Sequence, residues 1–100
     1  MQHVRMTLYA PNNGSAMHND AHVVLKKELL KYGGYTASYG TGNWLNPITS
    51  VEEMEPVIIY TVVANREKAF LFEKLAHQYK ELAGQQEVLY VIEDCKARSI

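Results

Sequence analysis

The feature that most constrains the fold is a strongly apolar segment in the second half of the chain, Val57-Ile58-Ile59-Tyr60-Thr61-Val62-Val63. It is the clearest strand pattern in the sequence. Nearly continuous apolarity is typical of a central strand that is covered on both faces. We therefore expect this strand inside a sheet, with helices or another subunit covering it.

Two segments have the pattern of helices. For the first, about residues 21–32, Asn19 or Asp20 is the expected N-cap, and Gly33-Gly34 is expected to end it. Asn65 is the expected N-cap of the second, about residues 66–83. Gly84 would end this second helix, whose apolar stripe consists of Ala69, Phe72, Leu75, Ala76, Tyr79, Leu82 and Ala83.

Three further segments alternate in strand fashion or are rich in strand residues, namely residues 4–9, 35–39 and 87–92. The predicted order of elements is therefore β-α-β-β-α-β, the ferredoxin-like or split β-α-β arrangement. We predict an α+β fold in one domain, residues 1–100, with a four-stranded antiparallel sheet and two helices on one face. The opposite face needs a cover, and a second copy of the chain is the simplest one. This argument predicts a homo-oligomer.

Composition and charge exclude several classes of function. Ten basic and eleven acidic residues give a net charge of −1, and no basic stripe is present to neutralise the phosphates of a nucleic acid. No apolar run approaches the roughly 20 residues of a membrane span. The start of the chain lacks the features of a signal peptide, and the single Cys95 cannot form an internal disulfide. We expect a cytoplasmic protein that binds neither nucleic acid nor membrane.

We expect a functional site in the segment from Gly33 to Glu55. It contains four of the six glycines and the only tryptophan. We expect Gly40 and Gly42 to bound the second strand, and the connection from Gly40 to Pro56, about 17 residues, exceeds what a hairpin needs. Such a connection suits a surface that binds a ligand or a loop that packs on a neighbouring subunit; a hairpin with glycine turns is the simpler alternative.

Aromatic and acidic residues in and near this segment are the candidate ligand contacts. Tyr35, Tyr39, Trp44 and Tyr60 could stack on a flat heterocycle or a cationic sulfonium, or fill a contact between subunits. Among the acidic residues Glu52, Glu53 and Glu55, the last is the strongest candidate, because it directly precedes Pro56 and the apolar strand. A solvated acidic loop is the alternative.

Other reactive residues do not form a recognisable site. His18 and His22 are four residues apart, but His18 precedes the expected helix cap, and no third ligand has a matching position. Cys95 has no signature of a catalytic nucleophile around it. We expect no metal and no cofactor.

The segment from Gly33 to Glu55 resembles the corresponding part of the phage-encoded S-adenosylmethionine lyases. These lyases are trimers of a PII-like, ferredoxin-like fold. Thr41-Gly42-Asn43-Trp44 matches their Thr-Gly-x-aromatic motif, although their aromatic residue is usually tyrosine. Glu55 follows Trp44 by eleven residues, as a glutamate does in that family. The segment Gln86-Glu87-Val88-Leu89-Tyr90 is similar to the family's last strand.

The resemblance implies a trimer with a site for an adenosyl ligand between subunits, in the cytoplasm of an infected host cell. The lyase would form methylthioadenosine and homoserine lactone without a cofactor. Glu55 would be the catalytic residue that orients the substrate, and the substrate-binding residues would be Tyr39, Thr41, Gly42, Trp44 and Tyr60. The alternatives are a non-enzymatic PII-like trimer that binds or sequesters a nucleotide-type molecule, and a structural oligomer without a ligand.

Overall fold

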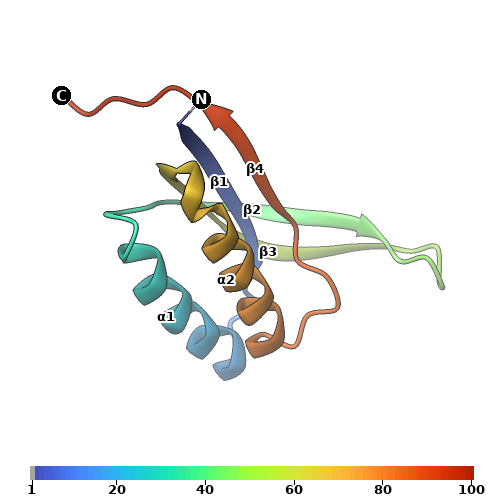
Figure 1. The fold of residues 1–100 in the computed structure, drawn as a ribbon. Helices are drawn as coiled ribbons and strands as arrows, with labels where there is room; N and C mark the ends of the chain where they lie inside the picture. Colours follow the sequence, from blue (N-terminus) through green and yellow to red (C-terminus); the bar gives the residue numbers. More distant parts are fainter. Residues whose placement is uncertain (1) are drawn as a thin grey trace.

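The computed structural model describes residues 2–100 and has a single sheet with two helices (Figure 1). The four strands are antiparallel and lie in the order β2-β3-β1-β4. This arrangement confirms the predicted ferredoxin-like fold. The elements are β1 (His3–Pro11), α1 (Ala16–Leu30), β2 (Thr36–Leu45), β3 (Glu52–Asn65), a short 3-10 helix (Arg66–Lys68), α2 (Ala69–Leu82) and β4 (Tyr90–Cys95).

Both helices cover the same face of the sheet and enclose one hydrophobic core (Figure 1). Strand alternation sends every second side chain of β1 and β3 toward the helices. These inward residues meet the apolar stripes of α1 and α2. The largest fully buried side chains are Tyr60, Tyr79, Phe72, Met6, Leu8, Leu25, Leu29, Val4 and Val62.

The apolar strand lies inside the sheet as predicted, because β3 pairs with β1 on one side and with β2 on the other. Its two faces differ, however. Ile58, Tyr60 and Val62 are buried beneath the helices, whereas Ile59 and Thr61 are only partly buried. No helix or strand within residues 2–100 covers that second face, which we call the open face.

The first helix begins earlier than predicted. Ser15 is its N-cap, and the Ser15 side chain accepts a hydrogen bond from the His18 backbone N–H at 3.2 Å. The prediction of Asn19 or Asp20 as the cap was wrong, since Ser15 already satisfies a free amide of the first turn. The second helix is preceded by a 3-10 turn, and Asn65 makes no side-chain capping bond there. Gly33, with φ of +96°, supports the predicted stop after α1.

The largest departure from the sequence analysis is the connection between β2 and β3. The expected long loop from Gly40 to Pro56 is wrong, because β2 continues through both glycines to Leu45 and only residues 46–51 connect the strands. The predicted turn at Asn46-Pro47 is confirmed. The last strand also starts later than predicted, at Tyr90.

The outer part of this hairpin projects beyond the body of the molecule (Figure 1). Strand β1 ends at Pro11, opposite Val57, so residues 41–56 have no β1 neighbour. We call residues 41–56 the arm. It contributes to an elongated molecule of 47 × 26 × 22 Å. No helix within residues 2–100 is long and apolar enough to span a membrane.

Candidate functional site

The arm brings three of the predicted site residues onto one face. Gly42 lies directly opposite Glu55, and Trp44 lies opposite Glu53. Side chains that face one another across an antiparallel pair point to the same side of the sheet. Because Ile58 and Tyr60 point toward the helices, the odd-numbered Glu53 and Glu55 point to the opposite side. The site therefore continues the open face of the sheet.

The indole of Trp44 lies over the backbone of Gly42. A Cβ atom at Gly42 would be 2.9 Å from Trp44 Cζ3 and 3.2 Å from Val57 Cγ1. A glycine at this position therefore makes room for the ring, and the ring in turn covers a strand glycine that has no side chain of its own. Trp44 remains 41% exposed, so part of its surface is accessible to a ligand or a partner.

The carboxylate of Glu53 is held in place by two donors. Trp44 Nε1 donates to Glu53 Oε2 at 3.2 Å, and Asn46 Nδ2 donates to Glu53 Oε1 at 3.1 Å. Asn46 Oδ1 in turn accepts from the backbone N–H of Ile48 at 2.9 Å, within the turn at the end of the arm. Glu53 was not singled out from the sequence, although its two-residue spacing from Glu55 places both carboxylates on one face of a strand.

The carboxylate of Glu55 differs from that of Glu53 in having no hydrogen bond or ion pair with any residue that the structure describes. Glu55 is partly buried at the base of the arm, two residues from Val57. Its backbone is thus held in the strand, and its carboxylate is available to an additional group. The candidate site consists of Gly42, Trp44, Glu53 and Glu55.

The other three predicted ligand contacts lie elsewhere. Tyr39 and Thr41 belong to the same strand but alternate to its other face, and Tyr39 is 81% exposed there. Tyr60 is 0% exposed and lies beneath the helices. The structure therefore does not bring these side chains together with Gly42, Trp44 and Glu55, and we leave them out of the candidate site.

Tyr60 belongs to a buried polar network with His22, Tyr79 and Pro11. His22 Nδ1 lies 2.7 Å from the Tyr60 hydroxyl, and His22 Nε2 lies 3.0 Å from both the Pro11 carbonyl oxygen and the Tyr79 hydroxyl. Tyr79 also donates to the Pro11 carbonyl. A carbonyl only accepts, so His22 Nε2 carries the hydrogen and Nδ1 accepts from Tyr60. Burial lowers the pKa of His22 and raises the pKa values of both tyrosines.

His22 and His18, the pair of histidines considered as metal ligands, both lie on α1. Because α1 begins at Ala16, His18 and His22 do share one helical face and are both buried, contrary to the sequence analysis. Their ring nitrogens are occupied, however: His18 Nδ1 accepts from the Asn13 backbone N–H at 3.0 Å. Within residues 2–100, no group of three His, Cys, Asp or Glu side chains could hold a metal ion.

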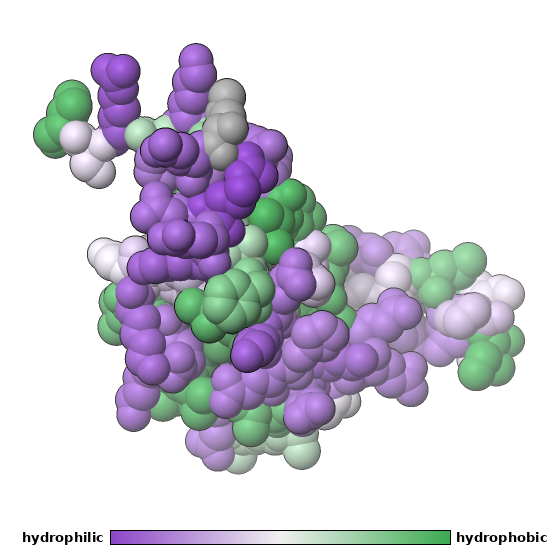
Figure 2. Space-filling view, viewed as in Figure 1, coloured by the Kyte–Doolittle hydropathy of each residue, from purple (hydrophilic) through white to green (hydrophobic). Residues whose placement is uncertain are grey.

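Apolar side chains gather at the end of the arm, as Figure 2 shows. The exposed large apolar residues of this region are Leu45, Ile48, Val51 and Met54. A small globular protein seldom exposes such a group without a partner to cover it. The arm therefore has the composition of a contact surface as well as of a ligand site.

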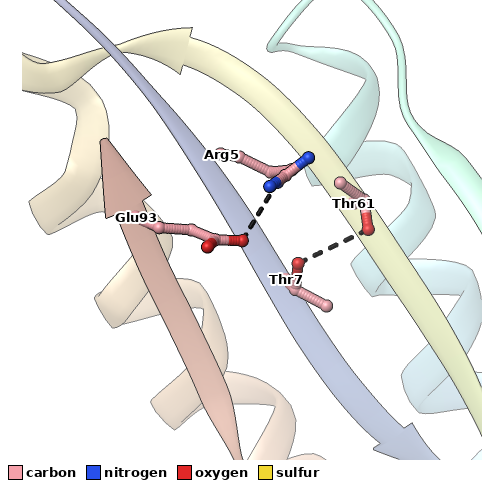
Figure 3. Close-up of polar contacts among 4 residues, drawn as sticks. All are labelled: Arg5, Thr7, Thr61 and Glu93. Carbon is pink, nitrogen blue, oxygen red and sulfur yellow. Dashed lines mark hydrogen bonds and ion pairs between the residues drawn. The ribbon is translucent and has the colours of Figure 1, made fainter. Parts of the chain in front are cut away.

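The open face of the sheet combines paired polar groups with partly exposed apolar ones. Figure 3 shows the paired polar groups of β1, β3 and β4. Arg5 Nε donates to Glu93 Oε1 at 3.0 Å, and the hydroxyls of Thr7 and Thr61 lie 3.5 Å apart. Val63, opposite Arg5 in the β1–β3 register, is exposed on the same face. Such a surface can be buried against another protein without leaving these polar groups unpaired.

Comparison with known proteins defines the fold. No protein-family model and no curated protein sequence matches the chain. Among solved structures, the periplasmic divalent cation tolerance protein CutA of Archaeoglobus fulgidus is 12% identical, with a TM-score of 0.68 over 97% of this chain and 87% of CutA. A phage SAM lyase in complex with S-methyl-5′-thioadenosine is 10% identical, with a TM-score of 0.66 over 93% of this chain and 81% of the lyase.

Another similar structure is the GlnK–ATP complex of Bacillus subtilis. It is 13% identical, with a TM-score of 0.62 over 92% of this chain and 80% of GlnK. At such identities the likeness establishes the fold and not the activity. The protein therefore has the ferredoxin-like fold shared by the PII and CutA proteins and by the phage lyase.

Proposed function

We propose that this protein is an S-adenosylmethionine lyase whose site lies on the open face at the base of the arm. The observation that carries the proposal is the position of Glu55 directly opposite Gly42, with the Trp44 indole over that glycine. These are the residues that match the lyase motif. The likeness in fold to a phage SAM lyase that binds S-methyl-5′-thioadenosine supports the same assignment.

The proposed reaction needs no base and no nucleophile from the protein. The substrate's own carboxylate oxygen attacks its γ-carbon, forming the C–O bond of homoserine lactone. The bond from the γ-carbon to sulfur breaks, and its electron pair neutralises the sulfonium to give methylthioadenosine. Charge and atoms balance within one molecule, so catalysis consists of holding the reactive conformer, which can contribute on the order of 7–11 kcal/mol.

Each site residue has a distinct task in this proposal. The indole of Trp44 offers a π-face to the adenine or the sulfonium. Glu55, whose carboxylate is not used by the fold, orients the cationic substrate. Glu53 is a positioning residue, because it holds the indole through Nε1 at 3.2 Å.

The site is exposed on one side, so we propose that a second copy of the chain completes it. The open face and the apolar end of the arm support a homo-oligomer, and we propose a trimer, as in the lyases that the motif resembles. An adenosyl ligand would then be enclosed between subunits. The mass of the protein in solution, measured by light scattering, tests this part separately.

Turnover of S-adenosylmethionine tests the activity. Purified protein is incubated with the substrate, and methylthioadenosine and homoserine lactone are measured by mass spectrometry. Glu55→Gln should lower turnover by about a hundredfold, as expected when a contact that holds the substrate in the reactive conformer is lost. Glu52→Gln is the matched control, because Glu52 lies on the other face of the same strand and should leave turnover unchanged.

Full activity of Glu55→Gln would remove Glu55 from the mechanism. A second candidate, a binding protein without turnover, is favoured by the likeness in fold to GlnK in its ATP complex. Binding of S-adenosylhomocysteine without product formation would support that candidate. Absence of both product and binding would contradict any adenosyl ligand at this site.

A further inference from the structure

A groove of about 350 Å³ lies between the two helices, on the side of the sheet away from the candidate site. Its volume is within the range of small-molecule sites. Hydrophilic side chains cover much of the helical side in Figure 2. The groove is lined by Glu28, Lys31, Tyr32, Lys68, Leu71, Lys74, Leu75 and Gln78.

The charge of this groove contrasts with the charge of the whole chain. Three lysines and one glutamate line it, whereas the chain as a whole has a net charge of −1. Lys31 Nζ is bonded to both oxygens of Glu28 at 2.9 Å. Lys68 and Lys74 form no ion pair with any carboxylate in the described residues. Two positive charges in the groove are thus not neutralised.

Apolar side chains form the floor between these charges. Leu75 is buried, and the ring of Tyr32 contacts the edge of Phe72 with centroids 6.4 Å apart. Leu71 is partly exposed beside them. Lys74 also lies over the ring of Phe70, with Nζ 5.7 Å from the centroid. That contact is weak at an exposed site, so an anion can compete for the ammonium group.

We propose that this groove binds a small amphipathic anion, with its acidic group at Lys68 and Lys74 and its apolar part on Leu71, Leu75 and Tyr32. An acidic group gains charge-assisted hydrogen bonds from the ammonium groups. The apolar part gains by leaving water. Neither contribution alone suffices at an open groove, so the ligand must carry both groups. This proposal is independent of the lyase proposal, because the two sites lie on opposite sides of the sheet.

The test uses octanoate as the probe, with octanol and acetate as probes that carry only the apolar or only the acidic group. Binding is followed by the amide NMR shifts of the full chain. Octanoate should give saturable shifts that concentrate on residues 28–32 and 68–78. Octanol and acetate should bind at least about tenfold more weakly, the ratio that corresponds to about 1.4 kcal/mol. Higher ionic strength should weaken octanoate binding.

Two double variants separate this groove from general surface charge. Lys68→Gln with Lys74→Gln should weaken octanoate binding about tenfold. Lys27→Gln with Lys96→Gln removes the same charge from exposed positions outside the groove and should leave the affinity unchanged. The proposal is overturned by equal effects of the two double variants, by octanoate shifts that map to the arm or the open face, or by equal binding of octanol.

Discussion

Two clusters in this molecule join aromatic rings to hydrogen-bonding partners, and they differ in what they leave free. In the core, His22, Tyr60 and Tyr79 are almost completely buried, and both ring nitrogens of His22 have partners. On the arm, the indole of Trp44 is 41% exposed, and its partner Glu53 has Glu55 beside it without a bond. Similar chemistry serves folding in one place and remains available to a ligand in the other.

The contrast shows why residue type alone does not identify a site. Tyr60 and Trp44 were equally good candidates for stacking on a ligand. The hydroxyl of Tyr60 is used to satisfy a buried imidazole, which would otherwise carry an unpaired acceptor in the core. Trp44 is held by an exposed carboxylate, and exposed contacts of this kind contribute little to stability.

The largest expected effect comes from removing the Tyr60 hydroxyl. Tyr60→Phe leaves His22 Nδ1 without a donor in a buried site, so the free energy of unfolding should fall by about 1–3 kcal/mol. Tyr39→Phe is the matched control, since Tyr39 is 81% exposed and its hydroxyl forms no hydrogen bond with another described residue. Its effect should stay within about 0.5 kcal/mol. Urea unfolding of both variants measures the difference.

Equal stability of the two tyrosine variants would contradict the structural role of the buried network. A loss of turnover in Tyr60→Phe with no loss of stability would instead move Tyr60 back to the site. Stability and turnover of this one pair of variants therefore decide whether the Tyr60 hydroxyl serves the core or a ligand site.

A smaller effect is expected from pH, through His22. Burial is the main cause that lowers the pKa of His22 below its ordinary 6.5; the charges of Lys26 and His18 lower it further, and the Pro11 carbonyl opposes them. Below pH 6.5 the unfolded chain therefore binds a proton that the folded chain does not. Stability is present in full above 6.5 and is lost as the pH falls, with a slope of at most about 1.4 kcal/mol per pH unit for one proton.

The measurement is the pH dependence of urea unfolding in the wild type and in His22→Gln. The other three histidines and all carboxylates are the same in both proteins, so the difference between the two curves isolates His22. The wild type should lose stability more steeply below pH 6.5. Parallel pH curves for the two proteins would show that folding does not hinder protonation of His22. The buried cluster would then be as accessible to a proton as the exposed cluster on the arm.

Much of the fold was predictable because it follows from hydrophobic periodicity. The apolar run from Val57 to Val63 and the stripe of α2 have the patterns of a central strand and an amphipathic helix, and both elements are confirmed. Within the stripe, Leu82 is the exception, because it is 41% exposed. The predicted start of α1 was wrong because Ser15 and Asn19 are both good N-caps in isolation. With the helix starting at Ser15, His18 Nε2 lies 3.2 Å from Gln85 Nε2, a residue far away in the sequence. A local pattern does not contain such a tertiary contact.

The arm was the least predictable part for a related reason. Gly40 and Gly42 usually mark the end of a strand, because glycine weakens a strand interior. Here neighbouring side chains cover the surface that the two glycines leave bare. Trp44 covers Gly42, and Ile59 and Val57 lie beside Gly40. The pairing of Gly42 with Glu55 follows from this continuous ladder. The motif residues were therefore found from the sequence, whereas their contact was not.

The smallest expected effect tests that contact directly. In Gly42→Ala the new methyl group would meet Trp44 Cζ3 at 2.9 Å and Val57 Cγ1 at 3.2 Å, so the indole must swing toward solvent. Because the ring is exposed and can move, the stability cost should be below about 1 kcal/mol. The emission of the single tryptophan should shift to longer wavelength. Gly40→Ala is the matched control, since its methyl group meets Ile59 Cδ1 at an ordinary 3.5 Å. Both glycines have strand backbone, so both variants share any gain from a less flexible unfolded chain. Identical emission from the two variants would mean that the indole does not rest on Gly42. The arm would then lack the Trp44–Gly42 contact on which its contrast with the buried core depends.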